Sequence, residues 1–233
     1  MGKLTVLYED NHCIVVVKPQ NVPSQEDASG DKDMLTMVKE YIKEKYNKEG
    51  EAYVGLVHRL DRPTGGIMVF AKTSKGASRL CEQIKNNDMQ KTYYCITSKI
   101  PQQKADTLTH FLKKDEKNNI VRVAPRGESG VKEAKLSYKV LQTNDDDEAL
   151  VEVKLITGRS HQIRVQFAAI NCPLVGDNKY GKDKTKASTN LGLWAGRLEF
   201  LHPVTKQKMI FAFPPDKDSS PWNKFFMDKY FLR

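Results

Sequence analysis

The sequence predicts an α+β fold from three observations. Short runs rich in β-branched and apolar residues recur along the chain with the length of strands. Four other segments repeat apolar residues at the spacing of an amphipathic helix. Short polar turns join the strand candidates in the middle of the chain, and short connections favour antiparallel neighbours. We therefore expect largely antiparallel strands with a few helices packed on them.

The first part of the chain predicts a hairpin, a helix, a strand and a second helix. The expected ranges are 4–8, 13–17, 33–46, 67–71 and 74–87. Asp33 and Ser74 are the expected N-caps, because a short polar side chain there accepts a hydrogen bond from a free N–H group of the first turn. Two prolines exclude regular structure in 18–24, and we expect the polar segment that follows, 25–33, to be exposed and mobile.

The rest of the chain predicts further strands and two more helices. The expected strands cover 91–97, 108–112, 120–123, 134–141, 149–156, 191–195, 198–200 and 209–213. Helical spacing of apolar residues indicates a helix over 157–170 and a C-terminal helix over 221–232, the latter from Trp222, Phe225, Phe226 and Tyr230. No linker rich in Gly, Ser or Pro divides the sequence, so we expect a single domain over 1–233.

The composition indicates a folded and basic protein. The chain has 233 residues, 39% of them hydrophobic, which is enough to bury a core. Its formal net charge of +9 favours a polyanionic partner, nucleic acid first, although the scattered lysines also fit an ordinary basic enzyme. The four cysteines lack metal-ligand spacing, and neither a signal peptide nor a membrane span is visible. We therefore expect a soluble cytoplasmic protein with no metal.

Residues 58–66, His-Arg-Leu-Asp-Arg-Pro-Thr-Gly-Gly, form the stretch that points most directly to chemistry. Asp61 lies between Arg59 and Arg62, which favour its ionised form. The Pro-Thr-Gly-Gly that follows forces a sharp turn before an apolar strand, and such a turn would fix the direction of the carboxylate. The pattern fits a preorganised anion, and it fits equally a turn-forming aspartate on a solvated loop. We interpret His58 as a structural histidine.

Three segments together resemble the RluA-like family of RNA pseudouridine synthases. They are 58–66, then 158–165 (Gly-Arg-Ser-His-Gln-Ile-Arg-Val), then 173–177 (Pro-Leu-Val-Gly-Asp) with Tyr180-Gly181. Weaker support comes from Lys-Thr-Tyr at 91–93 and from 191–195 running on to His202-Pro203. The segments occur in the family's order and span about residues 10–215. One such segment could arise by chance, but three in order are specific.

The resemblance implies an α+β catalytic domain whose mixed, largely antiparallel sheet is flanked by helices and has a central RNA-binding cleft. It implies that Asp61 is the essential carboxylate, that Tyr93 is the active-site tyrosine and that Arg164 is the basic residue pairing with the aspartate. The residues expected to bind the substrate are Arg59, Arg62, His161, Gln162 and Leu193, the last beside the target base.

The implied function is isomerisation of specific uridines in ribosomal or transfer RNA to pseudouridine, with the target base flipped out of the RNA fold. This reaction needs no cofactor and no metal, and the sequence offers no site for either. The Asp61 carboxylate can serve as nucleophile or as base, and the sequence leaves both roles open. We expect the protein to act as a monomer that does not bind membranes.

The sequence departs from the family pattern in two ways. The usual Thr-Ser-Gly after the aspartate is here Thr64-Gly65-Gly66, which loosens the turn and removes one hydroxyl group. Many relatives carry an N-terminal RNA-binding domain of the S4 type, and we expect none here, because the catalytic region begins close to residue 1 of this sequence. We therefore expect target choice to come from the catalytic domain or from a partner.

Each assignment also has a structural alternative. Tyr93 could pack in a strand, Arg164 could extend along a helix into solvent, and Leu193 could be an ordinary core residue. His161 and Gln162 could merely fix the start of a helix. An alternative of another class is a non-catalytic RNA-binding or ribosome-associated protein that keeps the fold. The presence of Asp61, Tyr93 and Arg164 speaks against that alternative, because binding alone needs no buried aspartate facing a polyanion.

Overall fold

The chain divides into two compact units, each built from two separate stretches of sequence. A computed structural model describes residues 4–47, 49–181 and 190–231. The first unit comprises Met1–Gln90 and Ala195–Phe213, and the second comprises Lys91–Trp194 and Pro214–Arg233. The single domain expected over 1–233 stays a prediction, and each unit is described by itself.

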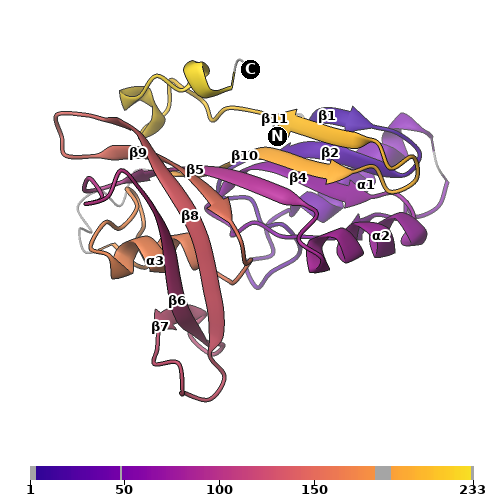
Figure 1. Ribbon diagram of the computed structural model, residues 1–233. Coiled ribbons are helices and arrows are strands. Elements are labelled where there is room, and N and C mark those ends of the chain that lie inside the picture. Colours follow the sequence, from indigo (N-terminus) through magenta and orange to yellow (C-terminus); the bar gives the residue numbers. More distant parts are fainter. Residues whose placement is uncertain (1–3, 48, 182–189, 232–233) are drawn as a thin grey trace. The chain divides into compact units, whose positions relative to one another are not determined.

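The first unit contains an antiparallel set of strands. Their order is β1 (Thr5–Glu9), β2 (Cys13–Lys18), β4 (Gly65–Ala71) and β10 (Leu193–Leu201), with β11 (Lys208–Ala212) beside β10 and β3 (Gly55–Leu56) beside β4 (Figure 1). The pairs β1–β2, β2–β4, β3–β4 and β10–β11 are antiparallel. The hairpin predicted at the start of the chain is therefore confirmed.

Two helices accompany these strands, and both were predicted. In α1 (Met34–Lys45), the Asp33 carboxylate caps the first turn by accepting a hydrogen bond from Thr36 N at 3.1 Å. In α2 (Ser74–Lys85), the cap is Thr73, one residue before the predicted Ser74. Apolar residues from β2, β4, α2 and β10 form a common core: Cys13, Val15, Ile67, Val69, Ala71, Leu80, Leu198 and Phe200.

The second unit is a second antiparallel set of strands with one helix. The strand order is β5 (Gln90–Thr97), β9 (Ala149–Leu155), β8 (Lys132–Thr143), β6 (Ala105–Asp115) and β7 (Ile120–Val123), and every neighbouring pair is antiparallel (Figure 1). The helix α3 (Gln162–Ala169) contacts β6 and β7. It is shorter than the predicted 157–170, because 157–161 form a turn. The predicted α+β class and the largely antiparallel strands are confirmed.

The predicted C-terminal helix over 221–232 is wrong. The described residues there form two short 3₁₀ turns, η2 (Trp222–Lys224) and η3 (Asp228–Tyr230), and Phe225 between them is extended. Phe225 and Met227 are buried, whereas Phe226 between them is 82% exposed. A helix would have turned Phe225 and Phe226 toward one face. Across the described part of the chain, no helix is long and apolar enough to cross a membrane.

Candidate active site

The loop that carries Asp61 joins a short extended segment to β4. Asp61 is half-buried, and its carbonyl oxygen accepts a hydrogen bond from Thr64 N at 2.9 Å, which closes the turn. Gly66 follows with a φ of 124°, a conformation that side-chain-bearing residues rarely adopt. A Cβ atom at Gly66 would lie 2.3 Å from the carbonyl oxygen of Ala195. The turn therefore needs glycine at this position for both conformation and space.

Two buried polar side chains fix the backbone on either side of this turn. Ser24 Oγ donates to Leu60 O at 2.8 Å and accepts from Leu60 N at 3.1 Å. His58 Nε2 accepts a hydrogen bond from Val69 N at 3.1 Å, so the ring links the start of the loop to β4. This contact supports the interpretation of His58 as a structural histidine.

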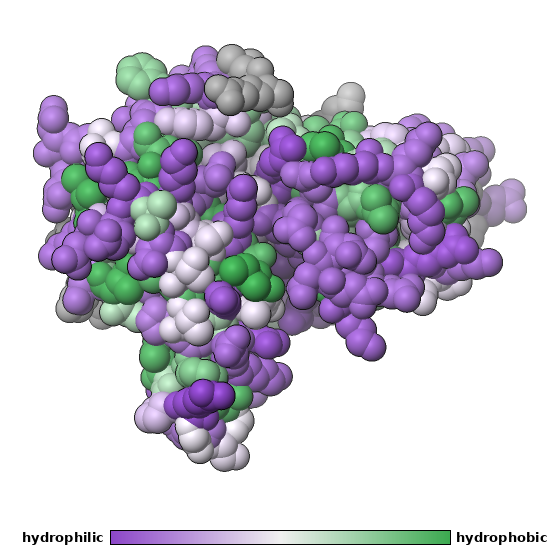
Figure 2. All heavy atoms as spheres, in the orientation of Figure 1, coloured by the Kyte–Doolittle hydropathy of each residue, from purple (hydrophilic) through white to green (hydrophobic). Residues whose placement is uncertain are grey.

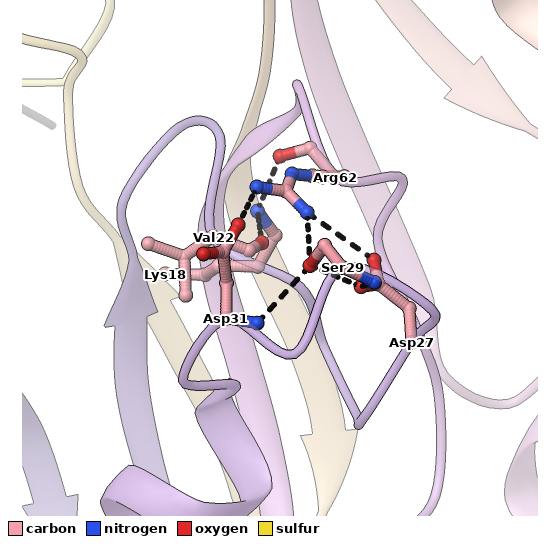
Figure 3. A network of polar contacts seen from close by, with 6 residues as sticks. All are labelled: Lys18, Val22, Asp27, Ser29, Asp31 and Arg62. Carbon is pink, nitrogen blue, oxygen red and sulfur yellow. Dashed lines mark hydrogen bonds and ion pairs between the residues drawn. The ribbon is translucent and has the colours of Figure 1, made fainter.

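The two arginines that flank Asp61 differ in their surroundings. Arg59 is exposed, so its guanidinium is open to an anionic ligand. Arg62 turns toward the loop at 27–31, where its Nη1 donates to Ser29 Oγ at 2.7 Å and its Nη2 binds the Asp31 carboxylate (Figure 3). The hydrogen bond from Arg62 lowers the pKa of Asp31. Part of the charge of Arg62 is thus balanced by this loop.

Arg164 forms a buried bidentate ion pair with Asp177. Its Nε lies 2.8 Å from Asp177 Oδ2 and its Nη2 lies 2.7 Å from Asp177 Oδ1. The exposed fractions of the two side chains are 7% and 0%. Asp177 Oδ1 also accepts hydrogen bonds from the backbone N–H groups of Lys179 and Tyr180. Such paired hydrogen bonds fix the plane of the guanidinium, and the Arg164 head group is therefore held in one orientation.

His161 and Gln162 lie where the turn at 157–161 enters α3. His161 adopts a left-handed conformation with a φ of 52°, and its Nδ1 lies 2.6 Å from Tyr180 Oη. The Gln162 side chain is buried and accepts hydrogen bonds from Thr157 Oγ1 and Arg159 N while donating to Lys135 O. These contacts hold the turn before α3. Contact of either residue with RNA stays a prediction.

Tyr93 and Leu193 are both buried in the second unit. Tyr93 lies in β5 opposite Val153 of β9 and is 6% exposed. Leu193 begins β10 and is 4% exposed. Their burial is compatible with core packing and with the wall of a base pocket, so their predicted roles are carried forward as proposals.

Among the described residues, Asp10, Cys13 and His202 offer three metal-ligand atoms within 4.8 Å of one another. His202 Nδ1 accepts from the backbone N–H groups of Val204 and Thr205, so the proton lies on Nε2, which donates to Asp10 Oδ2 at 2.8 Å. Burial and the nearby Asp10 raise the pKa of the Cys13 thiol to about 12. A metal ion bound here would have to replace the thiol proton of Cys13 and the Nε2 proton of His202. The three residues are therefore better explained as a hydrogen-bonded structural cluster than as metal ligands.

Sequence reasoning missed two residues that shape these sites. Asp177 belongs to a segment quoted for the resemblance, but its buried acidic side chain was given no role. Lys18 is fully buried, and its Nζ donates to Arg62 O at 2.9 Å, next to Asp61 (Figure 3). The only sequence signal for Lys18 is a lysine directly after the apolar run of β2. Its partner lies 44 positions away in the chain.

Comparison with known proteins gives consistent matches over most of the chain. The family model described as RNA pseudouridylate synthase matches residues 12–169. An RNA pseudouridine synthase of Bacillus subtilis named YhcT, itself termed uncharacterized, is 32% identical over 91% of this chain and 69% of its own length. Ribosomal large subunit pseudouridine synthase C of Buchnera aphidicola is 30% identical over 91% of this chain and 67% of its own. The solved structure of human RNA pseudouridylate synthase domain containing 4 has a TM-score of 0.77 at 23% identity, covering 92% of this chain and 89% of that one.

Proposed function

This chain belongs to the RNA pseudouridylate synthase family, and we propose that it isomerises specific uridines of ribosomal or transfer RNA through the Asp61 carboxylate. The role proposed for Asp61 rests on the hydrogen bonds that fix the backbone on both sides of it. Asp61 is half-buried, while the backbone of Leu60 and Arg62 on either side is hydrogen-bonded to buried side chains. A preorganised carboxylate of this kind suits a group that must meet a reacting atom in one geometry.

The chemistry is an intramolecular exchange of bonds. The N1 to C1′ bond of the uridine breaks, a C5 to C1′ bond forms, C5 loses its hydrogen as a proton and N1 gains one. Asp61 can act as nucleophile toward the sugar or base, or as base at C2′. Each route needs the carboxylate ionised when the nucleoside is bound. We propose that Arg164, oriented by Asp177, favours that state.

The remaining proposed contacts serve binding of the flipped uridine. Tyr93 would stack on the base or hydrogen-bond to it, and Leu193 would shield the detached base from water. Arg59, Arg62, His161 and Gln162 are proposed to lie along the RNA, where the arginines would contact phosphates without reading sequence. The Buchnera relative is named for the large ribosomal subunit, which makes ribosomal RNA the first substrate class to test. We propose that the protein acts as a cytoplasmic monomer.

The test is tritium release from RNA labelled at uridine C5. Because the new bond forms at C5, release reports isomerisation directly. Wild-type protein should release tritium from RNA of cells that lack the gene, and Asp61→Asn should abolish release while RNA affinity stays within about 3-fold, since the loss falls on the reaction and not on binding. Asp88→Asn makes the same chemical change at an exposed position of the first unit and should keep full activity.

Two outcomes would contradict the proposal. Turnover by Asp61→Asn at the wild-type rate would remove Asp61 from the reaction. No release by the wild type, from RNA known to contain unmodified target uridines, would leave RNA binding without isomerisation.

A further inference from the structure

Phe226 is a large apolar side chain that the second unit leaves in solvent. It is 82% exposed, and the next most exposed large hydrophobic residue in the described part of the chain, Tyr53, is 50% exposed. Its chain neighbours Phe225 and Met227 are buried, at 7% and 1%. Single exposed hydrophobic residues are common in proteins, so exposure alone indicates no site. What distinguishes Phe226 is the way in which its backbone is bound.

One side chain binds both polar groups of the Phe226 backbone. The Gln142 amide accepts a hydrogen bond from Phe226 N at 3.2 Å through Oε1 and donates to Phe226 O at 3.1 Å through Nε2. Gln142 belongs to β8, so a strand fixes this position of the C-terminal segment. Tyr230 Oη also donates to Leu141 O, the neighbour of Gln142, at 3.3 Å. The ring of Phe226 therefore extends into solvent from a backbone that is already ordered.

The turn between β8 and β9 is bound to the same C-terminal segment and carries acidic residues. Lys224 Nζ donates to Asp146 Oδ2 at 2.8 Å and to Glu148 Oε2 at 3.0 Å. Asp145 and Asp147 of this turn are exposed, and among the described residues neither of them forms an ion pair. Their negative charges are thus available to a ligand.

The charge of this region is opposite to that of the whole chain. Residues 142–148 carry four acidic side chains and no basic one, and residues 216–231 carry three of each. The two segments together therefore have a formal net charge of −4, in a chain whose net charge is +9. Such a surface repels a polyanion and attracts a cationic ligand. The charge disfavours RNA as the ligand here and favours a basic one.

We propose that Phe226, together with Asp145 and Asp147 of the adjoining turn, is a docking surface for a basic polypeptide segment of a partner protein. An apolar group of the partner covers the Phe226 ring, and lysine or arginine side chains pair with the two aspartates. Aromatic residues are enriched in the cores of protein interfaces, and complementary charges around them set the choice of partner. Because the backbone of Phe226 is ordered before binding, docking costs less conformational entropy. The inference does not depend on Asp61, since this surface takes no part in the isomerisation.

The experiment begins with a phage-displayed library of short random peptides. Peptides are selected on immobilised wild-type protein after those that bind Phe226→Ala have been removed, and the recovered ones should be rich in lysine and arginine and contain an apolar residue. A fluorescein-labelled synthetic copy of the commonest peptide then serves as the probe in fluorescence anisotropy. It should bind Phe226→Ala about 10-fold more weakly than the wild type, because truncating a central interface residue has an effect of this size.

Two further variants test the other parts of the surface with the same peptide. Reversing both charges, Asp145→Lys with Asp147→Lys, should weaken binding by about 10-fold at low salt and by less at high salt, because salt screens exposed charges. Gln142→Ala keeps the Phe226 ring but frees its backbone, and should weaken binding by about 3-fold through the lost preorganisation.

The matched controls change exposed residues of the first unit. Ile210→Ala truncates a side chain of β11 that is 46% exposed, and Glu44→Lys reverses an exposed acidic charge on α1. Both should keep the affinity for the peptide within about 2-fold of the wild type. Tritium release by Phe226→Ala should equal that of the wild type, which shows that the variant is folded and that the surface lies outside the catalytic machinery.

Three results would overturn the proposal. The first is recovery of no peptide, or of peptides that lack basic residues or bind Phe226→Ala as tightly as the wild type. The second is weaker RNA binding by Phe226→Ala in a filter assay, because the ring would then serve RNA. The third is self-association of the wild type in sedimentation velocity that Phe226→Ala abolishes, which would assign the surface to a contact between two copies of this chain. None of these results depends on whether Asp61→Asn is active, so this inference and the proposed function can fail separately.

Discussion

Folding buries the Lys18 ammonium group away from water, so the protonation of Lys18 depends on whether the chain is folded. Burial lowers its pKa from 10.5 to about 7, which means that between these values the unfolded chain binds the proton and the folded chain does not. The contribution of Lys18 to the free energy of unfolding therefore rises with pH across that window, by up to about 1.4 kcal/mol per pH unit. Below pH 7 the folded chain bears the full free-energy cost of burying the charged ammonium.

The prediction is a pH-dependent difference between the wild type and Lys18→Met. The free energy of unfolding of the wild type, minus that of the variant, should increase from about pH 7 to about pH 10 when both are measured by urea denaturation. A difference in stability that stays constant with pH would show that Lys18 remains charged in the folded protein.

At the scale of residues, sequence reasoning finds groups that belong to a local motif and misses their distant supports. Asp61 is indicated by its neighbouring residues and Arg164 by the family resemblance, and the catalytic roles of both stay predictions. The ion pair of Arg164 with Asp177 spans 13 positions and depends on how the chain returns after α3. The contact of Lys18 with the Asp61 loop spans 44 positions and depends on the β2–β4 register. A local sequence pattern predicts neither of these two contacts.

At the scale of elements, predictions succeeded where one local rule decides the structure. Alternating or continuous apolar runs predicted β2, β4 and β7, and the Asp33 cap predicted the start of α1. The strand β3 has only two residues, too few for any period to be visible. The C-terminal helix failed because several hydrophobic residues in a row fit either helical spacing or an extended segment with alternate burial.

Gly66 links an element to the candidate site, because β4 starts in a conformation that only glycine adopts readily. Gly66→Ala should destabilise the first unit by roughly 3 kcal/mol or more, since the added Cβ meets the Ala195 backbone and the φ of 124° is strained for alanine. Urea denaturation measures the loss. Gly127→Ala, where a Cβ would have no atom within 4 Å, should change stability little. Equal effects of the two substitutions would contradict a special role for Gly66.

At the scale of the whole molecule, the α+β class could be predicted, but the division into two units could not. Domain boundaries are usually sought in linkers rich in Gly, Pro or polar residues. Here the boundaries at Gln90/Lys91 and Trp194/Ala195 fall inside β5 and β10. Strand residues carry no linker signal, so a search by composition finds a continuous chain. Each unit also needs a distant second stretch of sequence, which local patterns do not reveal.

The net charge of +9 leads to a prediction about RNA binding as a whole. Figure 2 shows hydrophilic residues over much of one face of the molecule, with only separate hydrophobic patches. Binding through phosphate contacts releases counterions, so the logarithm of RNA affinity should fall linearly with the logarithm of salt concentration. Arg59 is exposed beside Asp61, and its proposed partner is a phosphate. Arg59→Ala should therefore reduce the magnitude of the slope of log affinity against log salt by the amount that corresponds to about one phosphate contact.

The control for this measurement removes the same charge elsewhere. Lys43 is exposed on α1, and Lys43→Ala lowers the net charge by the same amount as Arg59→Ala. If Arg59 contacts the RNA backbone, only Arg59→Ala changes the slope, and it weakens binding of target and non-target RNA to the same degree because phosphates carry no sequence information. If the two variants behave alike, the RNA responds to total charge, and a specific phosphate contact at Arg59 is excluded. Filter binding at several salt concentrations distinguishes the two results without requiring turnover, so it stands apart from every test that depends on Asp61.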